Sequence, residues 1–406
     1  MAQHLLADVL IPGGGDPLEQ AAVVLEGAEI TYAGTATDAP RRTSDDTVVE
    51  VPVLLPGLWD CHAHFIGLPS PDLARLATED PLTAAARAVG DAAALIDGGV
   101  TSVRDVGGMG LSLAPAIEEG RVPGPRIHAA GSVLSTTGGH GDIHSFPLDF
   151  AHAVSCTFGF SLLCDGVPEV LRAVRTNLRR GAKLIKICAS GGVMSEVDHP
   201  MHQQFSDEEL AAIVQEAARA ERIVAAHCHG KAGIVAALRA GCHTIEHGSF
   251  LDEEAADLMV EKGAFLVPTR FVISSLMDQL DTLPAYAATK LQMVADAHEQ
   301  AMKLAVAKGV RIAAGCDIFV SGGPYGSNGL EIAHLVNAGM SDLDAIDAAT
   351  ANAPMTLGPQ APRSGRLVAG YEADCIALDT NPLDDRSVWG DPTRVTHVWQ
   401  RGVRAK

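Results

Sequence analysis

The sequence predicts an α/β fold, a (β/α)8 TIM barrel with a small β-sandwich domain formed from both chain ends. Residues 57–357 alternate short apolar runs with Ala-rich stretches of helical spacing, which is typical of repeated βα units around a parallel sheet. Residues 1–56 and 358–406 instead carry short β-like runs between Gly and Pro turns. Polar side chains recur at the ends of the apolar runs in the middle segment, where a barrel of this kind collects its chemistry.

The strands can be assigned in order along the chain. The N-terminal runs ADVLIPGGG, AAVVLEGAEITYAG and TVVEVPVLLPG, with GRLVAGYEADCIALD and VTHVWQRGVRA near the C-terminus, are expected to join in one small sheet. Eight barrel strands are expected between them, namely LWDCHAH, TSVRDVG, RIHAAGS, KLIKICAS, RIVAAHCH, HTIEHGS, AFLVPTR and RIAAGCD. Stretches such as DPLTAAARAVGDAAALIDGG and SDEELAAIVQEAARAERI separate them and predict helices. Eight parallel strands are the number that closes a TIM barrel.

The composition limits the partners. The chain has 406 residues, 47% of them hydrophobic, and a net charge of −20 from 50 acids and 30 bases. This acidic balance argues against nucleic acid and an anionic membrane as partners. No stretch of about 18 apolar residues occurs, and the N-terminus lacks the regions of a signal peptide, so a cytoplasmic location is expected. The eight cysteines form no C-x-x-C pair, which predicts reduced core residues.

The first barrel strand, LWDCHAHF, carries two histidines one residue apart in an apolar run. Alternate side chains of a strand point to opposite faces, so His62 and His64 share one face. The pair alone also fits two hydrogen-bonded histidines with no ligand. Other strands must therefore decide between the two interpretations.

The ends of the other strands converge on one chemistry. Including the first strand, the polar residues expected at the C-terminal face are His62, His64, Lys186, His227, His229, His247 and Asp317. Neutral imidazole and carboxylate suit zinc and related divalent ions. Lys186 is the exception, because an ammonium cannot bind a cation. Between Ile185 and Ile187 it must be neutral, paired or chemically changed.

These motifs resemble the amidohydrolase superfamily, in its binuclear, carboxylated-lysine branch. The resemblance covers nearly the whole chain and is carried by DCHAHF, GAKLIKICASGG, VAAHCHG, TIEHGS, AAGCD and GYEADCIALDTNPL. Two further stretches, GPRIHAAGSVLSTTGGHGD and GGVMSEVDHPMHQQFSDEEL, are similar to the Xaa-Pro and Xaa-Arg dipeptidases and ochratoxinase-like enzymes.

The resemblance implies a ligand set. It implies two divalent metal ions, with zinc as the first choice, bridged by a carbamate that Lys186 forms with carbon dioxide. It assigns His62, His64 and Asp317 to one ion. It assigns His227 and His247 to the other. Lys186 without such partners would be explained by snorkelling or an ion pair.

Four residues are candidates for substrate contact. His229 would lie beside the metals, or it would only support a ligand by a hydrogen bond. His140, in the Gly-rich loop TTGGHGD, either reaches the substrate or is an ordinary loop residue. Arg270, after strand seven, would bind a substrate carboxylate at the barrel mouth or pair with an acid of the protein. Tyr325, in the loop SGGPYGSNG, is a second candidate for the same anion. Arg104 and Asp105 on strand two are interpreted as a buried ion pair or barrel filler.

The expected function is hydrolysis of an amide bond in a small molecule. A water activated by two metal ions would attack the carbonyl, and Asp317 would act as general acid and base. Dipeptides, N-acyl amino acids and ochratoxin-like aromatic amides are the expected substrates. The alternatives are a mononuclear-metal deaminase or cyclic-amide hydrolase, a hydrolase of neutral amide, carbamate or urea xenobiotics, and a barrel in which metals only stabilise the fold. The superfamily often assembles through barrel surfaces, so a homo-oligomer is a further expectation.

Overall fold

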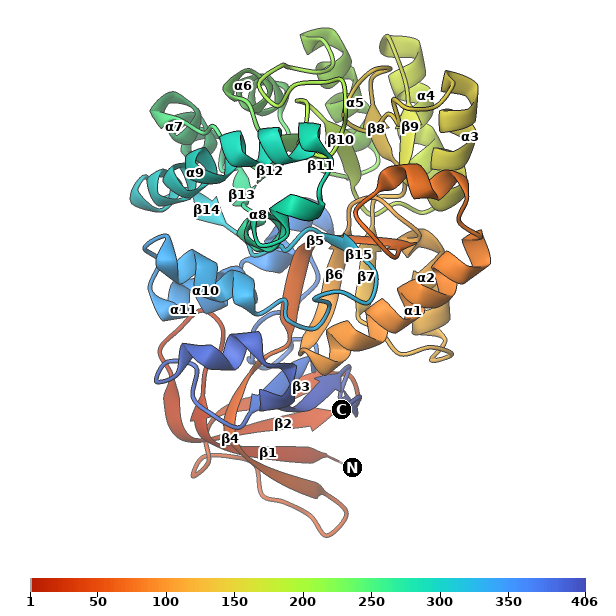
Figure 1. The fold of residues 1–406 in the computed structure, drawn as a ribbon. Coiled ribbons are helices and arrows are strands. Elements are labelled where there is room, and N and C mark those ends of the chain that lie inside the picture. The colour runs from red at the N-terminus through yellow and green to blue at the C-terminus, as the bar shows by residue number, and fades with distance from the viewer. Residues whose placement is uncertain (1) are drawn as a thin grey trace.

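A computed structural model describes residues 2–406. A barrel makes up the larger part, and a small sheet that contains both termini lies against one end of it (Figure 1). The expected fold class, a barrel with a smaller β unit from both chain ends, is confirmed. The domain boundaries after residues 56 and 357 stay a prediction.

The barrel strands run parallel, and each expected run contributes to one. They are β5 (Leu58–Leu68), β6 (Val100–Asp105), β7 (Arg126–Ala129), β8 (Val133–Ser135), β10 (Ile185–Cys188), β11 (Val224–Cys228), β12 (Thr244–His247), β13 (Phe265–Val267) and β14 (Arg311–Ile312). The third expected run, RIHAAGS, forms only β7, which pairs with β6, and after a break it is followed by β8, which pairs with β10 and with β9 (Ser161–Leu163). Gly131 lies in the break with a φ of +74°, a conformation that glycine adopts without strain. The barrel closes where β15 (Ile318–Val320) pairs with β5.

Helices surround the strands in the βα order that the sequence predicts (Figure 1). They are α1 (Pro81–Asp97), α2 (Gly110–Glu118), α3 (Leu148–Phe158), α4 (Val167–Arg179), α5 (Asp207–Arg219), α6 (Lys231–Ala240), α7 (Glu253–Lys262), α8 (Arg270–Met277), α9 (Ala285–Ala307), α10 (Leu330–Asn337) and α11 (Asp342–Ala348). Five short 3-10 segments are η1 (Leu73–Ala77), η2 (Leu280–Thr282), η3 (Ala353–Gln360), η4 (Arg386–Gly390) and η5 (Pro392–Arg394). Local chemistry sets some of these ends: α5 begins at a capping box in which Ser206 and Glu209 satisfy each other's backbone N–H groups.

The small sheet combines the two chain ends. Its strands are β1 (Gln3–Leu10), β2 (Leu18–Glu26), β3 (Glu29–Thr35), β4 (Thr47–Pro56), β16 (Cys375–Leu378), β17 (Val395–Gln400) and β18 (Val403–Arg404), in the order β18-β17-β16-β4-β1-β2-β3. They form one hydrogen-bonded sheet, and an antiparallel bridge from Glu29 to Glu372 brings its β3 edge back towards β16. The sheet therefore curls around its own core, in which Trp399 is fully buried.

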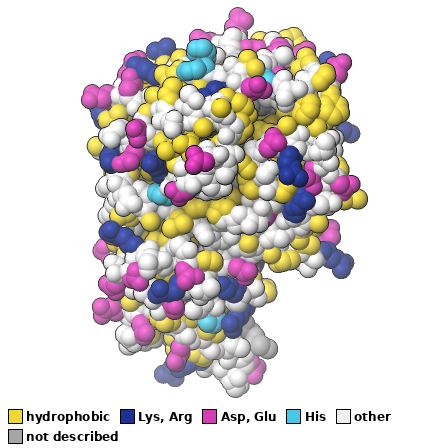
Figure 2. All heavy atoms as spheres, in the orientation of Figure 1, with side chains coloured by type: hydrophobic (Ala, Val, Ile, Leu, Met, Phe, Trp, Pro, Cys, Tyr) yellow, Lys and Arg dark blue, Asp and Glu magenta, His cyan; other side chains and the backbone are white. Residues whose placement is uncertain are grey.

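The other composition-based expectations can be compared with the structure. All eight cysteines are free, and all but Cys156 are buried. None of the helices in the described part of the chain is both long and apolar enough to span a membrane. Acidic and basic side chains are scattered over the face shown in Figure 2 and form no continuous basic surface there.

Candidate metal centre and its cavity

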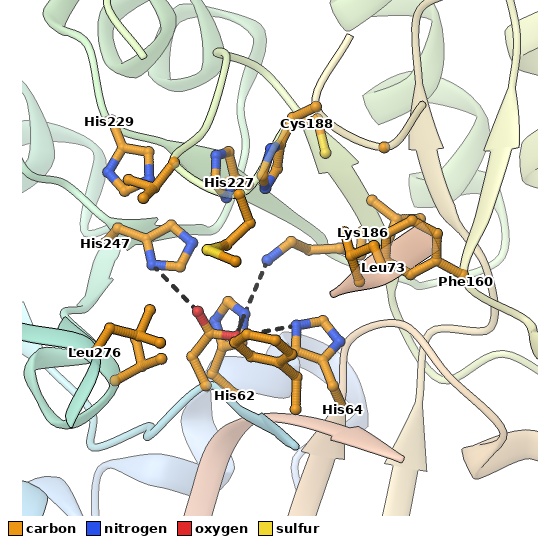
Figure 3. Close-up of a pocket in the computed structure, with 18 of the residues that line it drawn as sticks. His62, His64, Leu73, Phe160, Lys186, Cys188, His227, His229, His247 and Leu276 are labelled. Carbon is orange, nitrogen blue, oxygen red and sulfur yellow. Dashed lines mark hydrogen bonds and ion pairs between the residues drawn. The ribbon is translucent and has the colours of Figure 1, made fainter. Parts of the chain in front are cut away.

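Histidine side chains from three strands meet Lys186 and Asp317 at the C-terminal ends of the barrel strands. Figure 3 shows His62 and His64 of β5 on one side of a cavity, with His227, His229 and His247 on the other side and Lys186 reaching between them. The structure thus brings together every ligand that the resemblance implied, although the residues come from across 256 positions of sequence, from 62 to 317.

The ligand groups fall into two clusters. In the first, Nε2 of His64 and Nε2 of His62 lie 3.2 and 3.5 Å from Oδ1 of Asp317. In the second, one ring nitrogen from each of three histidines lies within 4.8 Å of the others, and these are His227, His229 and His247. Three-residue His and carboxylate clusters of this size fit divalent ions such as zinc. The donor set therefore fits two metal sites.

Lys186 lies at the junction of the two clusters. Its Nζ is 3.4 Å from Nε2 of His62, and the residue is only 2% exposed. No carboxylate among residues 2–406 forms an ion pair with it. Burial lowers the pKa of this amine. A buried amine without an anionic partner is the form of lysine that can react with carbon dioxide.

The second nitrogen of each ring contacts a protein group, and a partner that can only accept determines the tautomer. His62 Nδ1 lies 2.8 Å from Oε2 of Glu246, and His64 Nδ1 lies 2.7 Å from the carbonyl oxygen of Gly107. The carbonyl must accept, so His64 donates from Nδ1 and leaves the lone pair on Nε2. The remaining ring contacts are His227 Nε2 to Gly191 O at 3.3 Å, His229 Nδ1 to Ser249 Oγ at 2.7 Å and His247 Nδ1 to Thr269 Oγ1 at 2.8 Å. Outer contacts of this kind orient metal-binding histidines.

The contact between His62 and Glu246 depends on a buried ion pair. Oε1 of Glu246 lies 2.7 Å from Nη2 of Arg104, and both side chains are fully buried. Arg104 also donates from Nε to the carbonyl of Cys61 at 2.7 Å. Thr244 donates its hydroxyl to Oε1 of the same carboxylate. Although burial acts to raise the pKa of Glu246, Arg104 and His62 lower it, so this carboxyl stays ionised inside the barrel.

Asp60 connects strand β5 to the turn that carries Asp317. Its Oδ1 accepts from the backbone N–H groups of His62 at 2.9 Å and Cys316 at 3.0 Å, and its Oδ2 accepts from Asn328 at 2.6 Å. The backbone N–H of Asp317 donates to the carbonyl of His62 at 2.7 Å. The carboxylate of Asp317 is thereby placed beside both histidines of β5.

Three site residues have left-handed backbone conformations. The φ angles are +69° at His247, which ends β12, +58° at Thr269, two residues after β13, and +59° at Asp317, directly before β15. Such angles are unfavourable for residues with a Cβ and persist where surrounding contacts enforce them, which is common at functional sites.

Burial favours the neutral form of most of these imidazoles. It lowers the pKa of His62 to about 4, with Lys186 adding to the effect, and that of His229 to about 3. His64 differs, because although burial acts to lower its pKa, its contact with Asp317 raises it. Burial also lowers the pKa values of His227 and His247 well below the ordinary value. Neutral rings carry the lone pairs that a metal requires.

The cavity above the two clusters is mostly apolar. It encloses about 910 Å³, part of it open to solvent. Its apolar lining comes from η1, the loop after β10, α8, α9 and the β15 region, and includes Leu73, Val193, Met194, Val272, Ile273, Leu276, Leu291 and Phe319. Two expected substrate contacts, His140 and His229, also line it. Lys186 is the only cationic side chain among the described lining residues.

The structure does not bring the other two candidate substrate contacts into the cavity. Strand β13 ends at Val267 and α8 begins at Arg270, which turns the guanidinium away. Arg270 instead donates to the carbonyl of Ala295 at 2.7 Å and lies 3.6 Å from Glu299. The hydroxyl of Tyr325 donates within the wall, 3.0 Å from the carbonyl of His64 and 3.1 Å from that of Ile318. Arg270 therefore pairs with an acid of the protein, and the structure does not support the expected contact between Arg270 and a substrate carboxylate.

Sequence reasoning missed the residues behind the ligands. The sequence gives one sign of this support, which is the acidic residue Glu246 next to His247 in the apolar strand TIEHGS. The interpretation of Arg104 as half of a buried ion pair is right, but its partner is Glu246 rather than Asp105. Asp105 accepts instead from the backbone N–H groups of Phe65 and Gly110.

Known proteins of one family are similar to this chain over nearly its whole length. The model of the amidohydrolase family matches residues 53–404. The chain is 46% identical to the ochratoxinase of Aspergillus niger over 417 aligned positions, which cover 98% of this chain and 85% of that protein. The crystal structure of A. niger ochratoxinase has a TM-score of 0.93 at 45% identity, covering 100% of this chain and 95% of that one.

Two solved peptidases are also similar over the full chain. A prolidase complexed with N-methylphosphonate-L-proline has a TM-score of 0.92 at 34% identity, covering 100% of this chain and 99% of the prolidase. A Xaa-Pro dipeptidase with methionine bound in its active site has a TM-score of 0.90 at 31% identity, with the same coverage of 100% and 99%.

Glu246 offers a direct test of the buried support. Glu246→Gln keeps the size of the side chain but removes the charge that Arg104 and His62 share, so metal affinity should fall about 10- to 100-fold. Retained metal is measured under competition with a graded chelator. The matched control Glu299→Gln lies on the exposed side of α9 and should retain metal as wild type does. Wild-type affinity in Glu246→Gln would show that this carboxylate does not orient His62.

Proposed function

The chain belongs to the amidohydrolase family, as its motifs predicted, and we propose that it hydrolyses amide bonds with two divalent metal ions held at the ends of the barrel strands. The observation that carries the proposal is the pair of ligand clusters that face one cavity with Lys186 between them. A mononuclear deaminase would need the pair His62 and His64, one further histidine and Asp317, but no strand-four lysine.

The residues that would hold the ions divide as the clusters do. His62, His64 and Asp317 would bind one ion, and His227 and His247 the other. Lys186 would bind both after its neutral amine adds to carbon dioxide and releases a proton, which converts a neutral side chain into an anionic carbamate. The neutral imidazoles and the carboxylate favour zinc.

Two divalent ions in this position would supply a water of lowered pKa and would polarise the scissile carbonyl. Asp317 is the residue that can move the proton. Although burial acts to raise the pKa of Asp317, His62 and His64 lower it, so its carboxylate is ionised and can accept a proton from the attacking water. The same carboxyl can then donate the proton to the leaving nitrogen. His229, which lines the cavity beside His247, would contact the substrate.

The substrate is a small molecule with a sizeable apolar part. The apolar cavity wall favours aromatic and aliphatic groups on the two sides of the amide, as in N-acyl amino acids, hydrophobic dipeptides and ochratoxin-like aromatic amides. The similarity to ochratoxinase and to Xaa-Pro dipeptidase supports this range of substrates.

A substrate panel tests this function. Metal-loaded protein prepared with bicarbonate is assayed against one amino acid carrying acyl groups of increasing apolar bulk, from acetyl to aromatic. We expect kcat/KM to rise at least tenfold from acetyl to the aromatic acyl group, since about 1.4 kcal/mol of added burial corresponds to a decade. Arg270→Ala should keep wild-type kcat/KM. No hydrolysis of any member at two metals per chain would reject the proposed substrate class.

Substitutions of Lys186 test the proposed carbamate bridge between the two metal ions. Lys186→Ala should lose bound metal and turnover together, because it removes the only group placed to bind both ions. A short carboxylic acid added to the variant should restore part of both by replacing the carbamate. Lys186→Arg should also fail, because a guanidinium stays protonated and cannot form a carbamate. Metal analysis and turnover are measured in parallel, and full activity of Lys186→Ala would exclude the bridge.

A substitution of Asp317 tests its proposed role in proton transfer from the attacking water to the leaving nitrogen. Asp317→Asn should retain some metal but lower kcat by several orders of magnitude with a smaller change in KM, because the amide cannot take up the proton. The comparison uses steady-state kinetics normalised to bound metal. A kcat close to that of the wild type would mean that another group moves the proton.

A further inference from the structure

The loop between β10 and α5, residues 189–206, contacts two histidines of the cavity at once. The carbonyl of Gly191 accepts from Nε2 of His227 at 3.3 Å. Gly192 lies directly against the ring of His140, because a Cβ at Gly192 would come within 2.1 Å of His140 Nδ1. The rings of His140 and His227 stack with centroids 4.2 Å apart. The conformation of this loop therefore determines how both rings lie.

Asp198 organises the loop from inside. Its Oδ2 accepts from the backbone N–H of Gly192 at 2.9 Å and from the side-chain amide of Gln204 at 3.2 Å. Oε1 of the same Gln204 accepts from the backbone N–H of His140 at 3.0 Å. Oδ1 of Asp198 accepts the hydroxyl hydrogen of Ser195. The carboxylate thus joins the loop to the segment that carries His140.

Lys290 of α9 anchors the same loop. Its ammonium donates to the carbonyls of Ser195 at 2.7 Å, Gly192 at 3.3 Å and Asp198, and lies 3.3 Å from Oδ1 of Asp198. The side chain is 11% exposed. An ammonium can only donate, so its position beside Asp198 favours the ionised carboxylate, which can only accept.

The direction of the hydrogen bonds then follows from counting hydrogens. A serine hydroxyl has one hydrogen, and Ser195 gives it to Asp198. Ser195 Oγ must therefore accept in its other contact, which is with His140 Nδ1 at 2.8 Å. His140 carries its hydrogen on Nδ1. Its Nε2 has no hydrogen-bond partner within residues 2–406, and the ring lines the cavity.

We propose that Asp198, Ser195 and Lys290 are positioning residues that hold His140 in the Nδ1–H tautomer, with the Nε2 lone pair available to an N–H or O–H group of the substrate. The inference rests on the proposed hydrolytic function and specifies one substrate contact of that site. It differs from a purely mechanical role of the loop, because it depends on the direction of each hydrogen bond and not only on its presence.

Asp198→Asn tests this direction with little change in shape. The amide nitrogen of asparagine can donate to Ser195 Oγ, and the serine hydroxyl can then donate to His140 Nδ1, which moves the ring hydrogen to Nε2. The wrong tautomer behind an orienting aspartate lowers kcat by about 10⁴ in serine proteases. We expect a loss of about 10²- to 10⁴-fold in kcat for Asp198→Asn, at unchanged metal content. Ser195→Ala, which only releases the ring, should stay within about tenfold of wild type.

The double variant distinguishes tautomer control from simple packing. Ser195→Ala removes the hydroxyl through which the introduced amide would act, so Asp198→Asn combined with Ser195→Ala should recover the kcat of Ser195→Ala alone. A structural role predicts the opposite, a double variant at least as poor as Asp198→Asn. That result, or an Asp198→Asn variant no worse than Ser195→Ala, overturns the proposal. Lys290→Met should lower kcat more than the control Lys303→Met, whose lysine pairs with Glu299 on the outer side of the same helix.

A spectroscopic measurement does not depend on finding the right substrate. In zinc-loaded protein with ¹⁵N-labelled histidine, His140 is assigned by the signals lost in His140→Ala, and its two nitrogen shifts report the tautomer. Wild type should show Nδ1–H and Asp198→Asn should show Nε2–H. Nε2–H in wild type overturns the proposal even if Asp198→Asn does not fold. Nδ1–H in a protein without amidase activity would instead place the failure in the proposed function.

Discussion

The buried ion pair of Arg104 and Glu246 is the interaction on which the candidate metal centre depends. Both side chains are fully buried, so neither charge is screened by water, and each would be costly to leave without the other. Arg104 keeps Glu246 ionised, Glu246 faces His62, and His62 turns Nε2 towards Asp317 and Lys186. A continuous series of contacts thus runs through the barrel interior from Arg104 through Glu246 and His62 to Asp317.

The two clusters are supported in different ways. The first rests on the strands themselves, because Asp60 and Glu246 lie inside the barrel and contact β5 directly. The second depends on groups beyond the strand ends, namely Thr269, Ser249 and the carbonyl of Gly191. Changes in the loop after β10 therefore act directly on His227, which contacts the carbonyl of Gly191.

This separation matches the division between chemistry and substrate binding. The strand ends supply neutral imidazoles, a lysine and a carboxylate in fixed positions, which suits the hydrolytic step. Much of the cavity wall comes from η1, α8 and α9, which contribute none of the ligands, so its apolar character can vary with little effect on them. Relatives as different as ochratoxinase and Xaa-Pro dipeptidase share the fold at TM-scores of 0.93 and 0.90.

By itself the sequence determined the barrel, and it predicted the members of the two side-chain clusters. Strand alternation put His62 and His64 on one face, and the convergence of parallel strand ends grouped them with Lys186, because both rules depend on local backbone geometry. Only the tertiary structure paired Glu246 with Arg104, 142 positions away, since a side-chain contact across the barrel leaves no periodic signal. The tertiary structure also determined where the Arg270 side chain points. It points away from the cavity because α8 begins at Arg270, shortly after the short strand β13. The orientation of His140 was equally out of reach, because Ser195, Asp198 and Lys290 meet it only once the loop after β10 has packed against α9.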